Sequence, residues 1–517
     1  MRRPRLNYQK PAIDAFIERE RRDFRQCLTW QHAEIEEAVA KLPQRPPLFD
    51  GLRRSQQICV AIGAHLRRFG FFNDMGTGKT LIAMALAAYF DELEGGAGRF
   101  IVLVPNRVNI RGWLDQVNKH APHLKAVAMP SNMVEKRAVL ESTEALLIIE
   151  TYAGFSRLCA KSVGKKLVPD KGMTSGVAAS LSGLILDESS AIGNHRSLQT
   201  EVITAIAEAD PELCVFLLSG TPFGRDPHLL WPQMRLLDEG YTLGTTLGQF
   251  RSVFFKTKQN TWGGFEHEFI EKQTPLLHRC IAHRSIRFAL DQADLPAVNP
   301  IVVSLDLPRE AQRYHEAAIT TLRKAHGNFD LCKNAFMRLR QISSGFINMK
   351  DADTGEKDRL VFKENVKLEW IKSQIEAMDG PVIIFHDFIH SGEVLKQALD
   401  KLEVTNATIN GRVSSTAVNK AYDDFTQGRV RVLLLNSAAG AYGVNLQMAK
   451  YGVYYESPVP VIQRKQTELR FIRPGSDHGT VVKIDLVMNN TVDRAILAFH
   501  EQGEDLFQAI LDGRFKL

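Results

Sequence analysis

The sequence predicts an α/β protein with two parallel sheets. Short apolar runs alternate with helical stretches between residues 50 and 235, and the alternation returns after residue 380. Such alternation is typical of parallel strands joined by crossover helices. Polar residues follow directly after the apolar runs, where an open α/β sheet binds its ligands. The chain of 517 residues is long enough for roughly two to four domains.

The expected strands are short and lie in two groups. Those of the first group are 100–105, 145–150, 183–188 and 214–220, and those of the second are 381–387, 407–411, 431–437, 451–457 and 481–487. Charged helical sequence without Gly or Pro covers 12–42, and prolines at 43–47 end it. Helical segments are also expected around 309–343 and, as an amphipathic helix, from Thr491 onward.

Composition narrows the class of protein. Hydrophobic residues make up 44% and charged residues 24%, as in soluble globular proteins. The six cysteines form no Cys-x-x-Cys pair, which argues against a zinc site or a disulfide framework and for a reducing compartment. The net charge of +6 is compatible with a phosphate-backbone partner.

The chain is expected inside the cell and away from membranes. Its longest apolar run, 81–90, is too short to span a bilayer, and no apolar signal core follows the basic N-terminus. We expect a cytoplasmic or nucleoid-type location, nuclear in a eukaryote, and no secretion.

The stretch FFNDMGTGKT, residues 71–80, has the features of a phosphate-binding loop. An apolar run precedes it and a helical run follows, which is the context such a loop needs. Gly76 and Gly78 let backbone amides approach phosphate oxygens, Lys79 would reach the terminal phosphates, and Thr80 would ligate Mg²⁺. Asn73 stands where the strict pattern has glycine. The alternative is a Gly-rich surface turn.

Two further strand ends carry chemistry. In LILDESS, 184–190, Asp187 suits a Mg²⁺ contact and Glu188 suits polarising an attacking water, although Asp-Glu is also a common helix start. In LSGTPF, 218–223, Ser219 and Thr221 would sense the γ-phosphate, unless the stretch is an ordinary turn.

A basic helical stretch, 463–475, contains Arg470 and Arg473. Their spacing of three residues predicts one helical face. Arginines that face a γ-phosphate from another domain stabilise transition-state charge. The alternative is a solvated basic face.

In this order, the four pieces resemble superfamily-two helicases, and within them the Swi/Snf-type DNA translocases, over about residues 50–507. The resemblance implies two RecA-like lobes of the P-loop NTPase type, with ATP and Mg²⁺ in the cleft between them. The domains then expected are an N-terminal helical extension, 1–47; lobe one, 48–235; a linker with helical insertions, 236–365; lobe two, 366–490; and a C-terminal helix, 491–517.

The resemblance also implies roles for single residues. Gln56 would contact adenine, and Ser190 stands where the family usually has histidine. The loop implied to bind ATP in lobe one is Met75, Gly76, Thr77, Gly78, Lys79 and Thr80, and lobe two would add Gly443 and Asn445. Gln466 would join Ser219 and Thr221 in coupling hydrolysis to movement.

Nucleic-acid contacts are implied at strand ends of both lobes. They are Asn106, Arg107, Thr151 and Tyr152 in lobe one, and Asn410, Gly411 and Ser437 in lobe two. An N-terminal basic run (Arg19, Arg21, Arg22 and Arg25) could grip DNA or a protein partner, or simply be a solvated helix face.

The function implied is an ATP-hydrolysing motor that translocates on duplex or forked DNA in remodelling, recombination, repair or replication. A strand-separating DNA or RNA helicase is the first alternative. A non-catalytic DNA-binding scaffold is the second, and intact Lys79, Asp187, Glu188, Arg470 and Arg473 argue against it.

Overall fold

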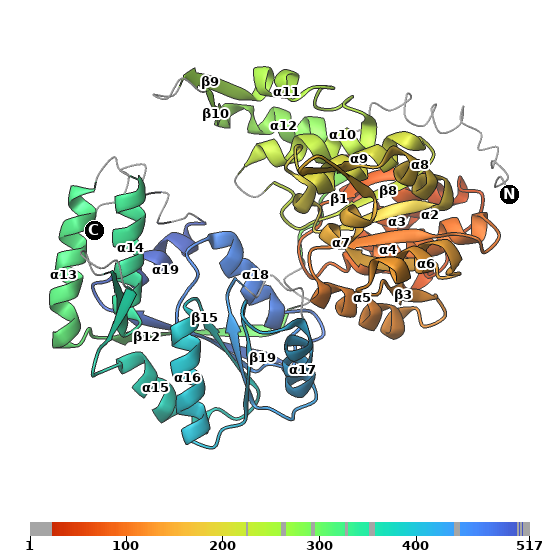
Figure 1. The fold of residues 1–517 in the computed structure, drawn as a ribbon. Helices are drawn as coiled ribbons and strands as arrows, with labels where there is room; N and C mark the ends of the chain where they lie inside the picture. The colour runs from red at the N-terminus through yellow and green to blue at the C-terminus, as the bar shows by residue number, and fades with distance from the viewer. Residues whose placement is uncertain are drawn as a thin grey trace. The chain divides into compact units, whose positions relative to one another are not determined.

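The computed structural model describes residues 23–223, 226–259, 265–290, 295–325, 329–350, 357–438, 445–503, 506 and 509. The chain forms two compact units that divide after Leu290 (Figure 1). Within the described ranges, no helix combines the length and the apolar character needed to cross a membrane.

The first unit is built on a seven-stranded parallel sheet, in the order β11-β1-β8-β7-β2-β4-β3. Its strands are β1 (Arg68–Phe71), β2 (Phe100–Val104), β3 (Ala126–Ala128), β4 (Leu147–Thr151), β7 (Gly183–Asp187), β8 (Cys214–Leu218) and β11 (Ser285–Ile286). Two antiparallel hairpins lie outside the sheet, β5 (Ala160–Val163) with β6 (Lys166–Pro169), and β9 (Phe255–Gln259) with β10 (Phe265–Phe269).

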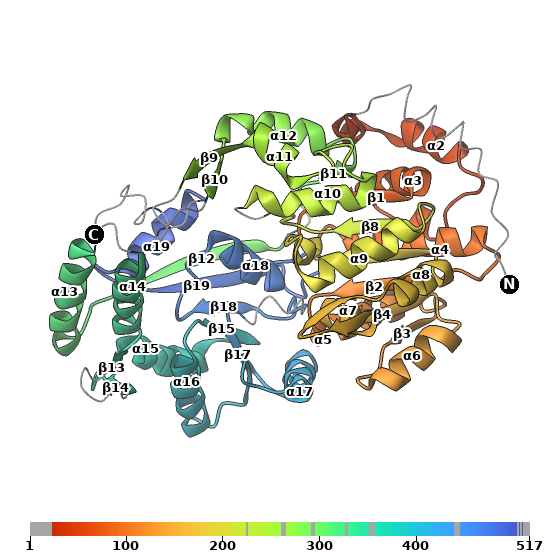
Figure 2. The ribbon, with the colours of Figure 1, turned by 45° about the horizontal axis from the view of Figure 1, so that its top comes forward.

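Helices cover both faces of this sheet, because alternate side chains of each buried strand point to opposite sides (Figure 2). Phe100 and Val102 of β2 join one core cluster, and Ile101 and Leu103 join another. The helices are α2 (His32–Ala40), α3 (Arg54–Leu66), α4 (Lys79–Leu93), α5 (Arg107–His120), α6 (Met133–Ser142), α7 (Tyr152–Leu158), α8 (Lys171–Ser180), α9 (Leu198–Ala209), α10 (Leu230–Asp238), α11 (Leu247–Phe254) and α12 (Thr274–Ile281). Short 3₁₀ helices are η1 (Phe24–Thr29), η2 (Phe49–Gly51), η3 (Ser189–Ile192), η4 (Pro227–Leu229) and η5 (Glu271–Gln273).

In the N-terminal segment, where helical structure is expected over 12–42, the structure describes residues from Asp23 onward. This part forms η1 and α2, which are separated by Trp30 and by Gln31, whose backbone is extended. Gln31 then starts α2 through a capping box with Glu34. Phe24 and Val39 are buried in the first unit's core. Arg25 pairs with Asp23, and Arg19, Arg21 and Arg22 lie outside the described residues.

The second unit contains a six-stranded parallel sheet in the order β12-β19-β18-β15-β17-β16. Its strands are β12 (Ala297–Leu305), β15 (Val382–His386), β16 (Asn406–Ile409), β17 (Val432–Asn436), β18 (Tyr451–Tyr454) and β19 (Thr480–Met488), and β13 (Phe346–Lys350) pairs with β14 (Lys357–Val361). The helices are α13 (Arg309–Lys324), α14 (Phe329–Ser343), α15 (Val366–Gln374), α16 (Ile389–Lys401), α17 (Ser415–Thr426), α18 (Val461–Phe471) and α19 (Val492–Glu501), with the 3₁₀ helix η7 (Ile375–Ala377).

The predicted α/β fold with two parallel sheets is confirmed, and all nine expected strand runs contain strands. The expected linker 236–365 contributes a strand to each sheet. From it, β11 pairs with β1 in the first unit, and β12 pairs along its full length with β19 in the second.

Candidate functional site

The loop between β1 and α4 has the backbone shape expected of a phosphate-binding loop. Gly76 and Gly78 have φ angles of +83° and +81°, in the left-handed region that favours glycine. A Cβ atom at Gly78 would lie 2.2 Å from Nε2 of Gln56 and would displace that amide group. Gln56 is buried and its Nε2 donates to the carbonyl oxygen of Thr77 at 3.0 Å. The hydrogen bond from the buried Gln56 side chain therefore stabilises the loop.

Lys79 begins α4, and its ammonium group turns back over the loop. Its Nζ donates to the carbonyl oxygens of Asn73 at 2.8 Å and Asp74 at 3.1 Å. Thr80, the next residue, is half-buried, as is Met75. A bound phosphate would compete with these two carbonyls for the ammonium group.

Asn73 is explained by what its side chain holds. It is 1% exposed, and its Oδ1 accepts the Phe288 N–H at 2.9 Å. The carboxylate of Asp74 accepts from the Arg287 guanidinium at 2.9 Å. The amide is uncharged, so it meets the Phe288 N–H without the desolvation cost of a buried carboxylate. The loop is thus fastened to the segment after β11.

Asp187 is the last residue of β7, the second neighbour of β1 in the sheet, and Glu188 follows it. Oδ2 of Asp187 accepts from Trp113 Nε1 at 2.9 Å, and Oδ1 accepts from the Glu188 N–H at 3.1 Å. Burial, then the Glu188 charge, raise the pKa of Asp187 to about 6, against the lowering effects of the Trp113 bond and the Lys79 charge. The electrostatic effect of Lys79 indicates that the loop and the carboxylates face one site.

The raised pKa of Asp187 predicts a pH-dependent effect of Asp187→Asn on stability, in protein free of metal and nucleotide. The folded protein holds this proton more tightly than the unfolded chain, so the favourable contribution is present at low pH and is lost as pH rises to about 6. The melting temperature of the variant relative to the wild type should therefore rise between about pH 4 and about pH 6 and stay level above that range. Thermal melts in chelator test this, and a difference that is equal at every pH contradicts it.

Ser219 and Thr221 lie beside the carboxylates, on the loop after β8. Ser219 is fully buried, its hydroxyl is 3.5 Å from Oε2 of Glu188, and its oxygen accepts the Thr221 N–H at 3.1 Å. Three strand ends that are separated in sequence thus converge within the first unit. Ser190 is half-buried in η3.

Two of the predicted nucleic-acid residues of the first unit cap helices. Asn106 accepts from the backbone of Val108 at 3.1 Å at the start of α5, and Thr151 accepts from Gly154 at 3.1 Å at the start of α7. Arg107 is exposed and donates to the Ser131 hydroxyl at 2.8 Å.

Tyr152 does not fit its predicted role in nucleic-acid contact. It is 1% exposed, packs in the core on one face of the sheet, and donates its hydroxyl to the carbonyl oxygen of Asp187 at 2.9 Å. Burial and the nearby carboxylates raise its pKa well above the ordinary value. The side chain therefore supports the acidic loop, which is the segment Asp187–Ser190 at the end of β7.

Behind Thr151 lies a buried ion pair between Lys136 and Glu150, whose side chains are 4% and 1% exposed. Oε1 of Glu150 accepts from the Thr151 N–H at 2.7 Å and from its hydroxyl at 3.0 Å. Gly154 leaves room for the pair, because a Cβ there would lie 2.6 Å from Oε1 of Glu150. The pair therefore fixes the orientation of Thr151.

Lys136→Met should lower the free energy of unfolding by about 3–5 kcal/mol, because it leaves the Glu150 carboxylate buried without its cation. Lys125→Met is the matched control: its partner is Glu144, and both side chains are largely exposed, at 70% and 87%. The control should change stability by less than about 1 kcal/mol. Urea unfolding measures both, and equal losses in the two variants contradict the assignment.

The two arginines of the second unit do not share a helical face. Arg470 lies in α18 and is 8% exposed, whereas α18 ends at Phe471 and Arg473 lies beyond its C-terminal cap. Burial lowers the pKa of Arg473, and the guanidinium of an arginine remains charged at pH 7. Gln466 is half-buried in the same helix.

The remaining residues predicted to bind ATP or nucleic acid in the second unit lie in loops. The side-chain oxygen of Asn445 accepts the Gln447 N–H at 3.2 Å, and that of Asn410 accepts the Arg412 N–H at 2.9 Å. Gly411 is exposed. Gly443 lies outside the described residues.

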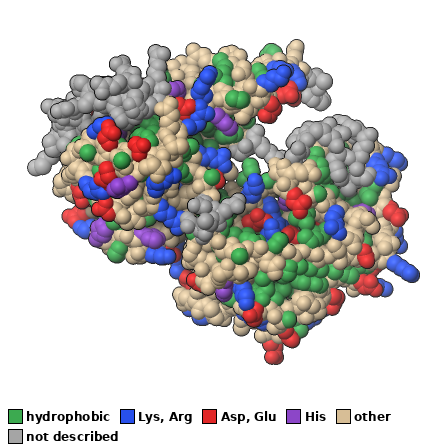
Figure 3. Space-filling model, turned by 180° about the vertical axis from the view of Figure 1, so that it is seen from behind, with side chains coloured by type: hydrophobic (Ala, Val, Ile, Leu, Met, Phe, Trp, Pro, Cys, Tyr) green, Lys and Arg blue, Asp and Glu red, His purple; other side chains and the backbone are tan. Residues whose placement is uncertain are grey.

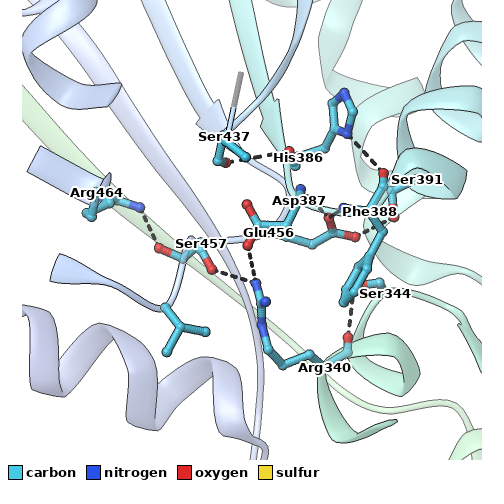
Figure 4. Close-up of polar contacts among 12 residues, drawn as sticks. Arg340, Ser344, His386, Asp387, Phe388, Ser391, Ser437, Glu456, Ser457 and Arg464 are labelled. Carbon is cyan, nitrogen blue, oxygen red and sulfur yellow. Dashed lines mark hydrogen bonds and ion pairs between the residues drawn. The ribbon is translucent and has the colours of Figure 1, made fainter. Parts of the chain in front are cut away.

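Ser437 does not fit its predicted role either. It is fully buried, and its N–H donates to the carbonyl oxygen of His386 at 2.8 Å where β15 and β17 end (Figure 4). Nearby, the Glu456 carboxylate accepts the N–H groups of Asp387 at 2.7 Å and Phe388 at 3.0 Å (Figure 4). This polar junction ties strand ends together, and the Ser437 hydroxyl is not presented to a ligand.

The chain matches two family models and several known proteins. A model of the SNF2-related domain matches residues 8–362, and a model of the helicase conserved C-terminal domain matches residues 366–475. The ISWI chromatin-remodeling complex ATPase CHR11 of Arabidopsis thaliana is 22% identical over 74% of this chain and 35% of its own length. The uncharacterized ATP-dependent helicase MG018 of Mycoplasma genitalium is 23% identical over 85% and 40%.

The chain thus spans between a quarter and a half of the length of the curated relatives that it matches. Among solved structures, the Sulfolobus solfataricus SWI2/SNF2 ATPase core in complex with dsDNA is similar at 20% identity. The match covers 89% of this chain and 93% of that one with a TM-score of 0.36.

Proposed function

Because the chain belongs to the SNF2-related family, we propose that it is an ATP-hydrolysing motor that translocates on duplex or forked DNA. The family match covers well over half of the chain and shows the family. The ATP-driven activity and the DNA substrate are proposed in addition.

One observation supports hydrolysis above the others. The loop that carries Lys79, the carboxylates of Asp187 and Glu188, and the hydroxyl of Ser219 belong to three strand ends that meet in the first unit. A loop that only bound phosphate would need no half-buried carboxylate facing its lysine. A hydrolytic site needs one group to hold the metal-bound nucleotide and another to orient water.

The residues present fit a magnesium ion bound together with ATP. The Thr80 hydroxyl and the Asp187 carboxylate are oxygen ligands, which Mg²⁺ prefers. Among the described residues no group of three or more His, Cys, Asp and Glu side chains could hold a metal ion. Mg²⁺ commonly uses one or two carboxylates plus substrate phosphates. The ion would neutralise charge on the phosphates.

The chain's own groups have distinct tasks in this proposal. Lys79 exchanges the carbonyls of Asn73 and Asp74 for phosphate oxygens, and the amides of the glycine turn bind the phosphates. Glu188 orients and polarises the attacking water. Arg470 and Arg473, from the second unit, would complete the site by meeting the charge that develops on the γ-phosphate.

The nucleic-acid part of the proposal rests on the family and on exposed residues of both units. Arg107 and Gly411 are exposed at strand ends and are available to phosphates. The net charge of +6 carries little weight alone, because Lys and Arg side chains are interspersed with Asp and Glu on the face in Figure 3.

Steady-state ATP hydrolysis tests the function directly. Rates are measured without nucleic acid and with single-stranded DNA, duplex DNA, forked DNA and RNA, and we expect strong stimulation by duplex or forked DNA. Stimulation by RNA alone supports the alternative of an RNA helicase and overturns the proposal. Hydrolysis without any response to nucleic acid overturns the motor while leaving the ATP site.

The affinity for duplex DNA should fall steeply with salt, because backbone contacts release counterions. Each phosphate neutralised contributes a slope of about −0.9 in log K against log [salt]. Half-maximal stimulation is measured between about 50 and 200 mM salt. An affinity that is independent of salt contradicts a backbone-binding motor.

A further inference from the structure

Gln233 of α10 links the acidic loop to the loop after β8. We infer that Gln233 and Ser189 are positioning residues that hold Glu188 in place and connect it to the Ser219–Pro222 turn. The inference rests on the proposed function, since it concerns the same site.

The side chain of Gln233 is fully buried and makes three short hydrogen bonds. Its Nε2 donates to the carbonyl oxygens of Pro222 at 2.5 Å and Leu229 at 2.6 Å, and its Oε1 accepts from the Ser189 hydroxyl at 2.7 Å. Carbonyl oxygens only accept, so the amide orientation is fixed. α10 also contacts η3, which contains Ser189, and β8. One amide therefore bridges the two loops.

The hydrogen bonds of Gln233 stabilise an uncommon backbone conformation at Glu188. Glu188 has φ +49° and ψ +59°, the left-handed region that residues other than glycine rarely occupy. Ser189 follows it directly and is fully buried, so its hydrogen bond to Gln233 fixes the C-terminal side of the strained residue. The Glu188 N–H is held on the other side by Oδ1 of Asp187 at 3.1 Å. The direction of the Glu188 carboxylate depends on both restraints.

A second connection between the same loops is weaker. The Ser219 hydroxyl is 3.5 Å from Oε2 of Glu188, at the limit of a hydrogen bond, and it joins the catalytic carboxylate itself. The hydrogen bonds of the Gln233 bridge are shorter than this contact, are buried away from water, and reach Glu188 through Ser189. A shift of the Ser219–Pro222 turn would therefore change the position of Glu188 mainly through Gln233.

Adjacent serines provide a matched test. Ser189→Ala removes the hydroxyl that donates to Gln233, and Ser190→Ala removes a neighbouring hydroxyl that has no hydrogen-bond partner in the described part of the chain. We expect Ser189→Ala to bind a fluorescent ATP analogue as the wild type does, and to lose at least about tenfold of the ratio between DNA-stimulated and unstimulated turnover. Ser190→Ala should keep that ratio. Thermal melts establish that both variants are folded.

Gln233→Leu extends the test, since leucine fills similar volume without the three hydrogen bonds. It should lower the stimulation ratio as Ser189→Ala does, with turnover affected more than the KM for ATP. The double variant should lose no more than the worse single variant, because both changes break one bridge. A purely structural role instead predicts lower melting temperatures with an unchanged ratio.

The outcomes separate this inference from the function on which it rests. A wild type without DNA-stimulated hydrolysis overturns the proposed function and the inference together. A stimulated wild type whose ratio survives Ser189→Ala overturns the inference alone. Additive losses in the double variant also overturn it, because independent effects exclude a shared bridge.

Discussion

Glu188→Gln is expected to lower ATP turnover by about 10²- to 10⁴-fold while nucleotide binding persists. Gln has nearly the shape of Glu but cannot take a proton from water, and a positioned general base contributes a factor of that size. The Ser219 contact can remain, because the amide oxygen also accepts a hydrogen bond. Lys79 and the glycine turn are untouched, so affinity for ATP should stay close to that of the wild type.

Glu201→Gln is the matched control for this prediction. Glu201 is exposed on α9, which starts after the acidic loop in the same unit, so the substitution makes the same chemical change outside the site. Single-turnover hydrolysis separates chemistry from product release. A Glu188→Gln enzyme with full turnover removes Glu188 from the role of base and leaves the phosphate-binding loop without an identified water-activating group.

The sequence predicts those parts of the fold whose signal is local. Central strands such as β2 and β7 are buried on both faces and appear as continuous apolar runs. The edge strands β11 and β12 lack that signal. β12 is largely exposed and contains Pro300, and β11 is only two residues long, so neither is distinguished from loop before the sheet is assembled.

In the site, too, the residues with a local sequence signal are predicted and those without one are not. Glycines before a lysine predict the loop because the backbone shape is encoded there. The bridge through Gln233 joins residues 44 positions apart in sequence, and a single glutamine in a helix gives no signal of its partner. Tyr152 and Ser437 follow strands as ligand-contacting residues do, and only the packed structure shows that their side chains are buried.

Arg470→Ala is expected to reduce turnover by about 10³-fold or more, the effect of losing an arginine that stabilises phosphoryl transition-state charge. Nucleotide affinity should fall far less, since the phosphate-binding loop lies in the first unit. Arg470 is 8% exposed, so truncation also removes packing. Arg470→Lys therefore accompanies it, because lysine keeps the charge and the stem but loses the planar fork, and it should not restore turnover.

Arg412→Ala is the control for this prediction, because the Arg412 side chain is 72% exposed in the second unit and makes a long ion pair at 3.5 Å with Glu393.

Arg473→Ala should resemble Arg470→Ala if both guanidinium groups meet the γ-phosphate, even though the end of α18 separates them. Turnover at saturating ATP and duplex DNA, together with affinity for the nucleotide, distinguishes the cases. An Arg470→Lys enzyme with wild-type turnover would mean that positive charge alone suffices at this position. An Arg470→Ala enzyme with wild-type turnover would show that Arg470 takes no part in ATP hydrolysis.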